Sequence, residues 1–180
     1  MIKRLCLLAA LLGILGAAQL SAQVAAPASN FSTPSPQELG KLVAPVALYP
    51  DKLLSVVLPA STFPLQIVQL EGYLQKHPNL KPGNAHTQMQ SLGYPPPVAA
   101  LAAFPSVVKL MSSKLDWTTK LGEAIIANEK AVMNAVQAYR RRAYKANKLV
   151  SNQKQKVVLQ GTDTIEIIPT NPEVIYVPVY

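Results

Sequence analysis

The chain begins with an apolar pattern that is typical of an export signal. Two basic residues at positions 3–4 precede an apolar run over residues 5–15, and small residues follow that run. A basic start, an apolar stretch of about 7–15 residues and a small-residue exit characterise secretory signal peptides. The alternative, a retained membrane-spanning helix, needs about 20 apolar residues, whereas Gln19 interrupts this run. We therefore expect residues 1–22 to be a signal peptide, with cleavage after residue 18 as the other option.

The next segment changes from polar and irregular to helical. Residues 23–34 are rich in Ala, Ser, Pro and Asn and show no periodicity, so we expect a flexible linker. Ser35, Pro36 and Glu38 then match a capping box, with a Ser cap, Pro at the first helical position and Glu three residues after the cap. This pattern predicts a helix that begins at Pro36. Pro45 is expected to end it, because the residue before a proline avoids helical angles.

Proline also marks the start of a series of further short helices. A proline is tolerated in the first helical turn because its missing N–H has no partner there. We expect helices to begin at or near Pro50, Pro64, Pro82, residues 95–97 and Pro105.

Several residues are expected to separate these helices. Pro59 should kink or stop the helix that starts at Pro50. Ser61 or Thr62 should cap the helix that starts at Pro64. Gly93 should end a helix as its left-handed closing residue.

The largest predicted element is a helix from Trp117 to about Lys148, capped by Asp116. Apolar residues recur close to helical spacing along it, at Leu121, Ile125, Val132, Val136, Tyr139, Ala143 and Ala146. Gly122 and Asn128 are candidate bends, so the pattern fits one bent helix or two. We expect this element to organise the core, and we expect Trp117 to be buried there.

The period changes near the C-terminus. Residues 155–160 and 164–168 are β-branched and apolar, and a loop containing Gly161 separates them, which predicts a hairpin. A third short strand is expected at residues 174–177. Helices first and strands last indicate an α+β fold, mostly α. The expected domain spans residues 35–180, with several short proline-initiated helices, one long helix and a small antiparallel β-hairpin or meander at about 155–178.

Composition adds two constraints. The chain of 180 residues has 16 Pro and 8 Gly without a fixed period, which excludes a collagen-like repeat. Its single cysteine, Cys6, lies in the signal segment, so the mature domain is expected to be stabilised by a buried core rather than by disulfides.

Five sequence blocks resemble those of a known bacterial family. The blocks are Leu42–Asp51 (LVAPVALYPD), Pro59–Leu65 (PASTFPL), Leu115–Gly122 (LDWTTKLG), Val132–Gln137 (VMNAVQ) and Pro172–Tyr180 (PEVIYVPVY). In this combination and order the chain resembles an exported family known as domain of unknown function 3300. The resemblance implies a compact exported domain, helical with a small β element, and no known activity, ligand or catalytic residue. Family members usually continue beyond the last block into a Tyr/Pro-rich and then a Gly/Trp-rich or polar tail, so we expect a minimal or truncated member.

The residue types needed for catalysis do not form a recognisable pattern. His77 and His86 are the two histidines, without a carboxylate beside either, so we expect no metal site. There is no Gly-x-Ser-x-Gly elbow and no phosphate-binding glycine loop. The acidic residues available for a carboxylate pair are Glu38, Asp51, Glu71, Asp116, Glu123 and Glu129. Sequence alone pairs none of them, and we expect no catalytic residue and no cofactor.

Aromatic residues allow two interpretations. Trp117, Tyr49, Tyr73 and Phe104 would suit a groove for stacking a ligand, but aromatic residues at such spacing more often belong to a core because each buries a large apolar area. We favour the core.

The strongest functional signal is a concentration of positive charge. From Lys130 to Thr162 there are eight basic residues and no acidic one. Arg141, Lys145 and Lys148 fall on one stripe of the long helix. The stripe is either the solvated face of an amphipathic helix or a binding surface for an anionic partner. The candidate anion-binding residues are Arg140, Arg141, Arg142, Lys145 and Lys148.

These patterns together predict an exported envelope protein that is not an enzyme and acts as a binding or interaction module. It would use either the basic helix face or an exposed strand edge, because an unpaired edge is a template for strand addition. The candidate edge residues are Val174, Tyr176, Val177 and Tyr180. The expected partners are an anionic envelope polymer, a lipid surface or another envelope protein, but not nucleic acid. The alternative is an envelope glycan-modifying hydrolase.

Overall fold

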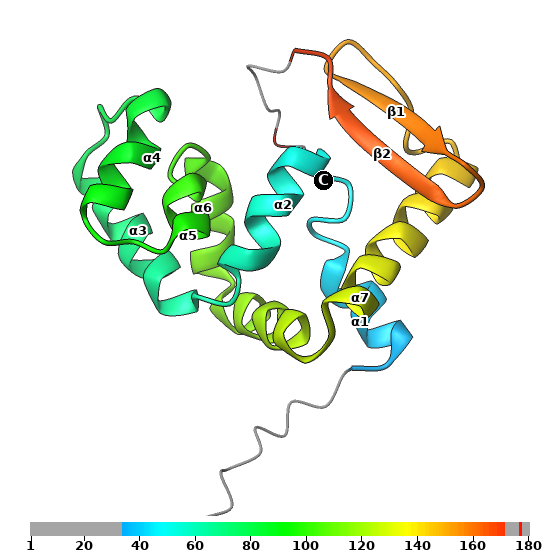
Figure 1. Ribbon diagram of the computed structural model, residues 1–180, viewed down its shortest axis with the longest axis horizontal. Helices are drawn as coiled ribbons and strands as arrows, with labels where there is room; N and C mark the ends of the chain where they lie inside the picture. The colour runs from blue at the N-terminus through cyan, green and yellow to red at the C-terminus, as the bar shows by residue number, and fades with distance from the viewer. Residues whose placement is uncertain (1–33, 172–176, 178–180) are drawn as a thin grey trace, which may run out of the picture. The chain divides into compact units, whose positions relative to one another are not determined.

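Seven helices followed by a hairpin make up the part of the chain that the structure describes. The computed structural model describes residues 34–171 and residue 177 (Figure 1). Its elements are α1 (Pro36–Val43), α2 (Asp51–Ala60), α3 (Pro64–Lys76), α4 (Pro82–Ser91), α5 (Pro96–Leu101), α6 (Pro105–Ser113), α7 (Leu115–Lys145), β1 (Gln155–Gln160) and β2 (Thr164–Pro169). The α+β fold, mostly α, is confirmed.

Proline begins most of the short helices, as predicted. It occupies the first turn of α1, α3, α4, α5 and α6. The capping box of α1 is complete: the Ser35 hydroxyl accepts from the Glu38 N–H at 3.3 Å, and the Glu38 carboxylate accepts from the Ser35 N–H at 2.8 Å. Gly93 has a φ of +81° after α4, which confirms its left-handed closing role.

The predicted cap of α3 is wrong. The Ser61 hydroxyl donates back to the Leu58 carbonyl at 2.6 Å, and the Thr62 hydroxyl donates back to the Pro59 carbonyl at 2.8 Å. Phe63 is the cap residue of α3, and no side chain bonds to the start of that helix. The last carbonyls of a helix have no intrahelical donor. Ser and Thr hydroxyls readily bond backward to such groups.

The first half of α7 begins two residues earlier than predicted, at Leu115 rather than Trp117. Lys114 is its cap residue, and Asp116 lies in the first turn, where a negative charge suits the helix dipole. Gly122 stays helical and does not bend the helix. A Cβ at Gly122 would lie 2.2 Å from the Ser61 carbonyl oxygen, so glycine allows α7 to approach the corner between α2 and α3.

A kink at Asn128 divides α7, as the sequence suggested. Asn128 has non-helical angles (φ −165°, ψ 86°), and its side-chain oxygen accepts from the Ala131 N–H at 2.9 Å. Asn128 therefore caps the second half of α7. This half runs beside α1 and reaches the hairpin (Figure 1).

The helix ends at Lys145 rather than near Lys148. Asn147 has a φ of +55°, and the Lys148 N–H bonds the Ala143 carbonyl at 2.9 Å. This is a Schellman motif, in which a left-handed residue turns the chain and satisfies the last carbonyls. Lys148 consequently lies beyond the helix.

The core consists of a main cluster among the helices and a small cluster beneath the hairpin. The smaller cluster contains Leu48, Leu149, Ile165 and Ile167. The four aromatic residues in question belong to the main cluster or pack against it, as we favoured. Trp117 is half-buried rather than buried, and its indole N–H donates to the Leu42 carbonyl at 2.8 Å.

The hairpin is antiparallel, with Gln155 opposite Pro169 and Gln160 opposite Thr164. Gly161 has a φ of +62° in its loop. Residues 174–176 of the predicted third strand lie outside the described residues. Val177 is half-buried and packs against the main core.

None of the described helices is by itself long and apolar enough to cross a membrane. The helices α2 and α3 reach the length and apolar composition of a membrane span only when they are counted together, and a bend of 112° separates them.

Candidate functional site

Arg140 lies in the interior, so its placement among the exposed cations was wrong. Its side chain is 1% exposed. Nε donates to the Ala47 carbonyl at 2.8 Å, and Nη2 donates to the Tyr49 carbonyl at 2.9 Å. Nη1 donates to the Ile165 carbonyl at 2.8 Å and to the carboxylate of Asp51. We call Arg140 with these four partners the arginine cluster.

The arginine cluster joins four segments of the domain. The turn after α1, the first residue of α2, the second half of α7 and β2 each supply one or more of its members. A guanidinium has five N–H donors in a fixed plane, which suits it to several carbonyls at once. Among the described residues no buried side-chain N or O lacks a hydrogen-bond partner. The cluster is therefore a structural joint rather than a binding surface.

A sequence signal for this burial was available. Arg140 follows Val132 and Val136 at intervals of four residues, and both valines are fully buried. Residues four apart share one face of a helix. Arg140 thus belongs to the apolar stripe of α7, whereas its two arginine neighbours do not.

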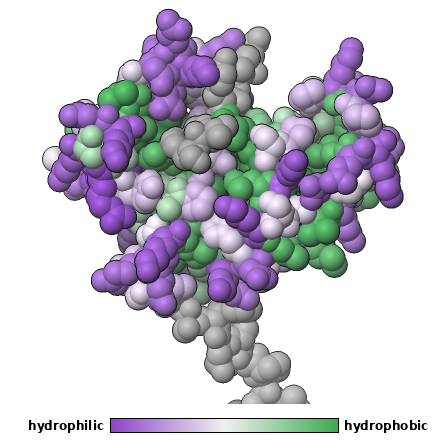
Figure 2. All heavy atoms as spheres, turned by 180° about the vertical axis from the view of Figure 1, so that it is seen from behind, coloured by the Kyte–Doolittle hydropathy of each residue, from purple (hydrophilic) through white to green (hydrophobic). Residues whose placement is uncertain are grey.

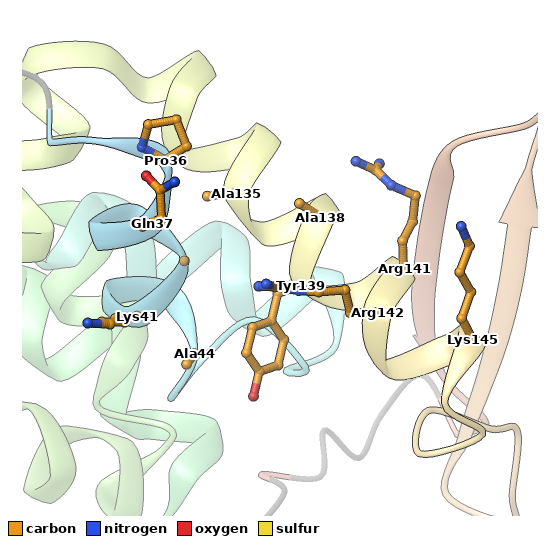
Figure 3. A pocket seen from close by; sticks show the side chains of 11 residues that line it. Pro36, Gln37, Lys41, Ala44, Ala135, Ala138, Tyr139, Arg141, Arg142 and Lys145 are labelled. Atoms are coloured by element: carbon orange, nitrogen blue, oxygen red, sulfur yellow. The ribbon is translucent and has the colours of Figure 1, made fainter.

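Three cations near the end of α7, Arg141, Arg142 and Lys145, border an open hollow of about 780 Å³ between α1 and the second half of α7. Its lining, which we call the basic groove, is Pro36, Gln37, Gly40, Lys41, Ala44, Ala135, Ala138, Tyr139, Arg141, Arg142 and Lys145 (Figure 3). Both helices contribute residues at intervals of three and four, the spacing that places side chains on one face. No Asp or Glu is among these lining residues.

The groove cations are held in different ways. Arg141 is half-buried, and its Nη1 donates to the Asp163 carbonyl in the hairpin loop at 2.7 Å. The guanidinium of Arg142 lies 5.7 Å from the centre of the Tyr139 ring, a cation–π distance. Arg141 and Lys145 extend from successive turns of α7 in the same direction, whereas Arg142 crosses toward α1 (Figure 3). Like charges one turn apart repel each other by about 0.2–0.5 kcal/mol, and a bound anion would relieve that repulsion.

Lys148 remains near these cations although it is not on the helix. A smaller hollow adjoins the groove and has Tyr139 and Arg142 in its lining as well. Lys148 borders this second hollow. The structure therefore brings four of the five predicted basic residues into one region. Lys41 of α1, which the sequence did not suggest, also lines the groove. In Figure 3, Lys41 extends away from the three cations of α7.

Several residues considered for catalysis or metal binding have structural partners. Hydrogen bonds from Ser35 hold the pKa of the Glu38 carboxyl below its usual value. Glu71 accepts from the Gln75 amide at 3.1 Å. The His77 ring stacks on Tyr73 with 4.0 Å between ring centres. The described residues contain no group of three or more His, Cys, Asp or Glu side chains that could hold a metal ion.

Most of the predicted strand-edge site, namely Val174, Tyr176 and Tyr180, lies outside the described residues. The edge of β1 that faces away from β2 lies within the described residues, and nearby side chains bond to some of its backbone N–H groups. The Val157 N–H donates to the Ser151 hydroxyl at 2.9 Å, and the Gln155 N–H donates to the Asn152 side chain at 3.1 Å. Covered backbone groups give an incoming strand fewer partners.

Comparison with known proteins identifies relatives without assigning an activity. A family model described as "Protein of unknown function (DUF3300)" matches residues 35–180. The chain is similar to the uncharacterized protein YacH of Escherichia coli (strain K12), with 34% identity over 195 residues. The match covers 91% of this chain and 31% of YacH, so the chain spans less than half the length of that curated relative. No solved structure matches the chain.

Proposed function

This chain belongs to the DUF3300 family, whose function is unknown, and we propose that it is an exported, non-catalytic module that binds an anionic component of the cell envelope through the basic groove. Export is supported by the basic start and apolar run of residues 1–22. The mature chain is expected to begin near Gln23 or Gln19. Intact-mass measurement of the secreted product tests this, and a cytoplasmic product that retains Met1 would contradict it.

The observation that supports anion binding is the concave arrangement of Arg141, Arg142 and Lys145 without a carboxylate in the same lining. A cleft lined by charges of one sign focuses the field and raises the local concentration of ions of opposite charge. Arginine also matches the geometry of phosphate and carboxylate groups through its planar donors. Charges of both signs would keep an exposed helix face equally soluble, so solubility alone does not explain a lining in which every charge is positive.

A soluble polyanion tests the proposal. Fluorescence anisotropy with labelled polyphosphate should show binding at low salt. The double variant Arg142→Glu and Lys145→Glu should lose that binding. The matched control is Lys109→Glu with Lys120→Glu, which changes the net charge equally at two exposed positions outside the groove. Equal losses in both double variants would mean that net charge alone attracts the polymer, and the groove would then have no special role.

A further inference from the structure

The end of α7 places exposed apolar side chains next to the basic groove. A third hollow, lined by Tyr144, Lys145, Asn147, Leu149, Val150, Ser151 and Val157, shares Lys145 with the groove. Tyr144 is 42% exposed and Val150 is 50% exposed. Lys145 is thus flanked by the groove on one side and by these two apolar residues on the other.

These side chains are presented by fixed backbone. The Lys148 N–H and the Leu149 N–H both bond the Ala143 carbonyl, at 2.9 and 3.2 Å. Leu149 itself is 1% exposed and anchors the turn in the small core beneath the hairpin. Tyr144 and Val150 are therefore displayed by an ordered helix end and an anchored turn.

The floor of the groove is also apolar. Small or apolar residues form it, namely Pro36, Gly40, Ala44, Ala135 and Ala138. Charged side chains stand around this floor (Figure 3). Figure 2, which views the molecule from behind, shows the same type of surface elsewhere, with hydrophilic side chains projecting and apolar ones between them. The charged residues in the lining of the groove are all positive.

We infer that this end of the protein binds the surface of a membrane that contains anionic phospholipid. Phosphate groups bind Arg142 and Lys145, while Tyr144 and Val150 enter the boundary between headgroups and acyl chains. The inference rests on the proposed function, since it names the anionic component that the groove binds.

The combination of side chains favours a lipid surface over a soluble polymer. Basic residues near an anionic bilayer are attracted to its surface potential. Tyrosine is enriched at membrane interfaces because its ring is apolar and its hydroxyl is polar. A soluble polyanion would use the cations alone and would leave Tyr144 and Val150 in water.

Vesicle sedimentation of the full chain tests the inference. Vesicles of phosphatidylcholine mixed with phosphatidylglycerol should bind the protein more tightly than vesicles of phosphatidylcholine alone. The apolar run 5–15 is present in every variant, so its own contribution cancels when variants are compared. Thermal melting first establishes that each variant is folded.

Three double variants separate the contributions. Arg142→Glu with Lys145→Glu should weaken binding to the anionic vesicles by at least about tenfold. Tyr144→Ser with Val150→Ser keeps every charge and should weaken vesicle binding by about tenfold while leaving polyphosphate binding unchanged. The control, Lys109→Glu with Lys120→Glu, should have a smaller effect than either. If the Val150 change disturbs the turn, Tyr144→Ser alone should still produce part of the loss.

The outcomes distinguish this inference from the proposed function. Groove-dependent polyphosphate binding without vesicle binding would overturn the membrane inference and leave the proposed function standing. If the Tyr144→Ser with Val150→Ser variant binds anionic vesicles as tightly as the native chain, the membrane inference is also overturned, because the attraction is then electrostatic only. Binding to neither probe would overturn both.

Discussion

Three consecutive arginines on α7 lie in two different regions of the molecule. Arg140 is 1% exposed and bonds three backbone carbonyls and Asp51, whereas Arg142 is exposed beside Tyr139 in the basic groove. The residue type and the helix are the same. The difference arises from the rotation of about 100° per residue along a helix, which turns neighbouring positions to different faces.

The comparison shows what decides the role of a cation. A buried guanidinium is tolerated only when protein groups replace the water that it loses, and the arginine cluster provides those groups. An exposed guanidinium keeps its water and remains available to an external anion. One basic run therefore supplies both a structural joint and a candidate binding surface.

The largest effect that separates the two regions should come from Arg140→Met. Removal of the guanidinium leaves the carbonyls of Ala47 and Tyr49 without their donor, and the loss should be about 3–5 kcal/mol of unfolding free energy. Urea denaturation measures it. The control Arg142→Met should cost about 1 kcal/mol or less, because its ring interaction is exposed. If both variants lose a similar unfolding free energy, Arg140 and Arg142 do not differ in their structural role.

Salt should affect the two regions differently. Exposed charges are screened beyond about 8 Å at physiological ionic strength, whereas buried pairs are screened much less. Raising the salt concentration from low to well above physiological should weaken polyphosphate binding by about tenfold or more. The stability difference between the native chain and Arg140→Met should change little over the same range. A strongly salt-dependent difference in stability would mean that the partly exposed ion pair with Asp51, rather than the bonds to the buried carbonyls, accounts for most of the contribution of Arg140.

Asp51→Asn should have a smaller effect than the loss of Arg140. The Asp51 side chain is 43% exposed, so its attraction to Arg140 is partly screened. An asparagine keeps an oxygen that accepts from Arg140, and the cost should be about 1 kcal/mol, the usual worth of one hydrogen bond. Urea denaturation of the double variant Asp51→Asn with Arg140→Met completes a double-mutant cycle. If the two losses of unfolding free energy simply add, the two residues do not act as a pair.

Local sequence patterns predicted the elements of this domain better than its surfaces. Prolines in first turns, the capping box at Ser35 and the left-handed Gly93 act within a few residues, so sequence alone revealed them. Arg140 was misplaced because its partners are 25 to 93 residues away.

The candidate site shows the same limit. Helical spacing predicted that Arg141 and Lys145 share one face, and Arg142 was a candidate because it belongs to the same basic run. Lys41, in contrast, lines the groove only because α1 packs against the second half of α7, a contact that no local pattern encodes.

The smallest expected effect concerns the wall of the groove rather than its cations. The helix α1 forms that wall, and its start is held by the hydrogen bonds between Ser35 and Glu38. Folding lowers the pKa of the Glu38 carboxyl through these bonds, so Glu38 stabilises the domain at pH values above its unfolded pKa. That contribution is lost as the pH falls through the folded pKa. The thermal midpoint of Glu38→Gln should therefore lie slightly below that of the native chain near neutral pH, and the two midpoints should converge in acid.

A double variant tests whether this effect is independent of the arginine cluster. Because α1 does not contribute to that cluster, Arg140→Met should lose the same unfolding free energy with and without Glu38→Gln. A loss that depends strongly on Glu38→Gln would show that the groove wall and the arginine cluster respond as one unit.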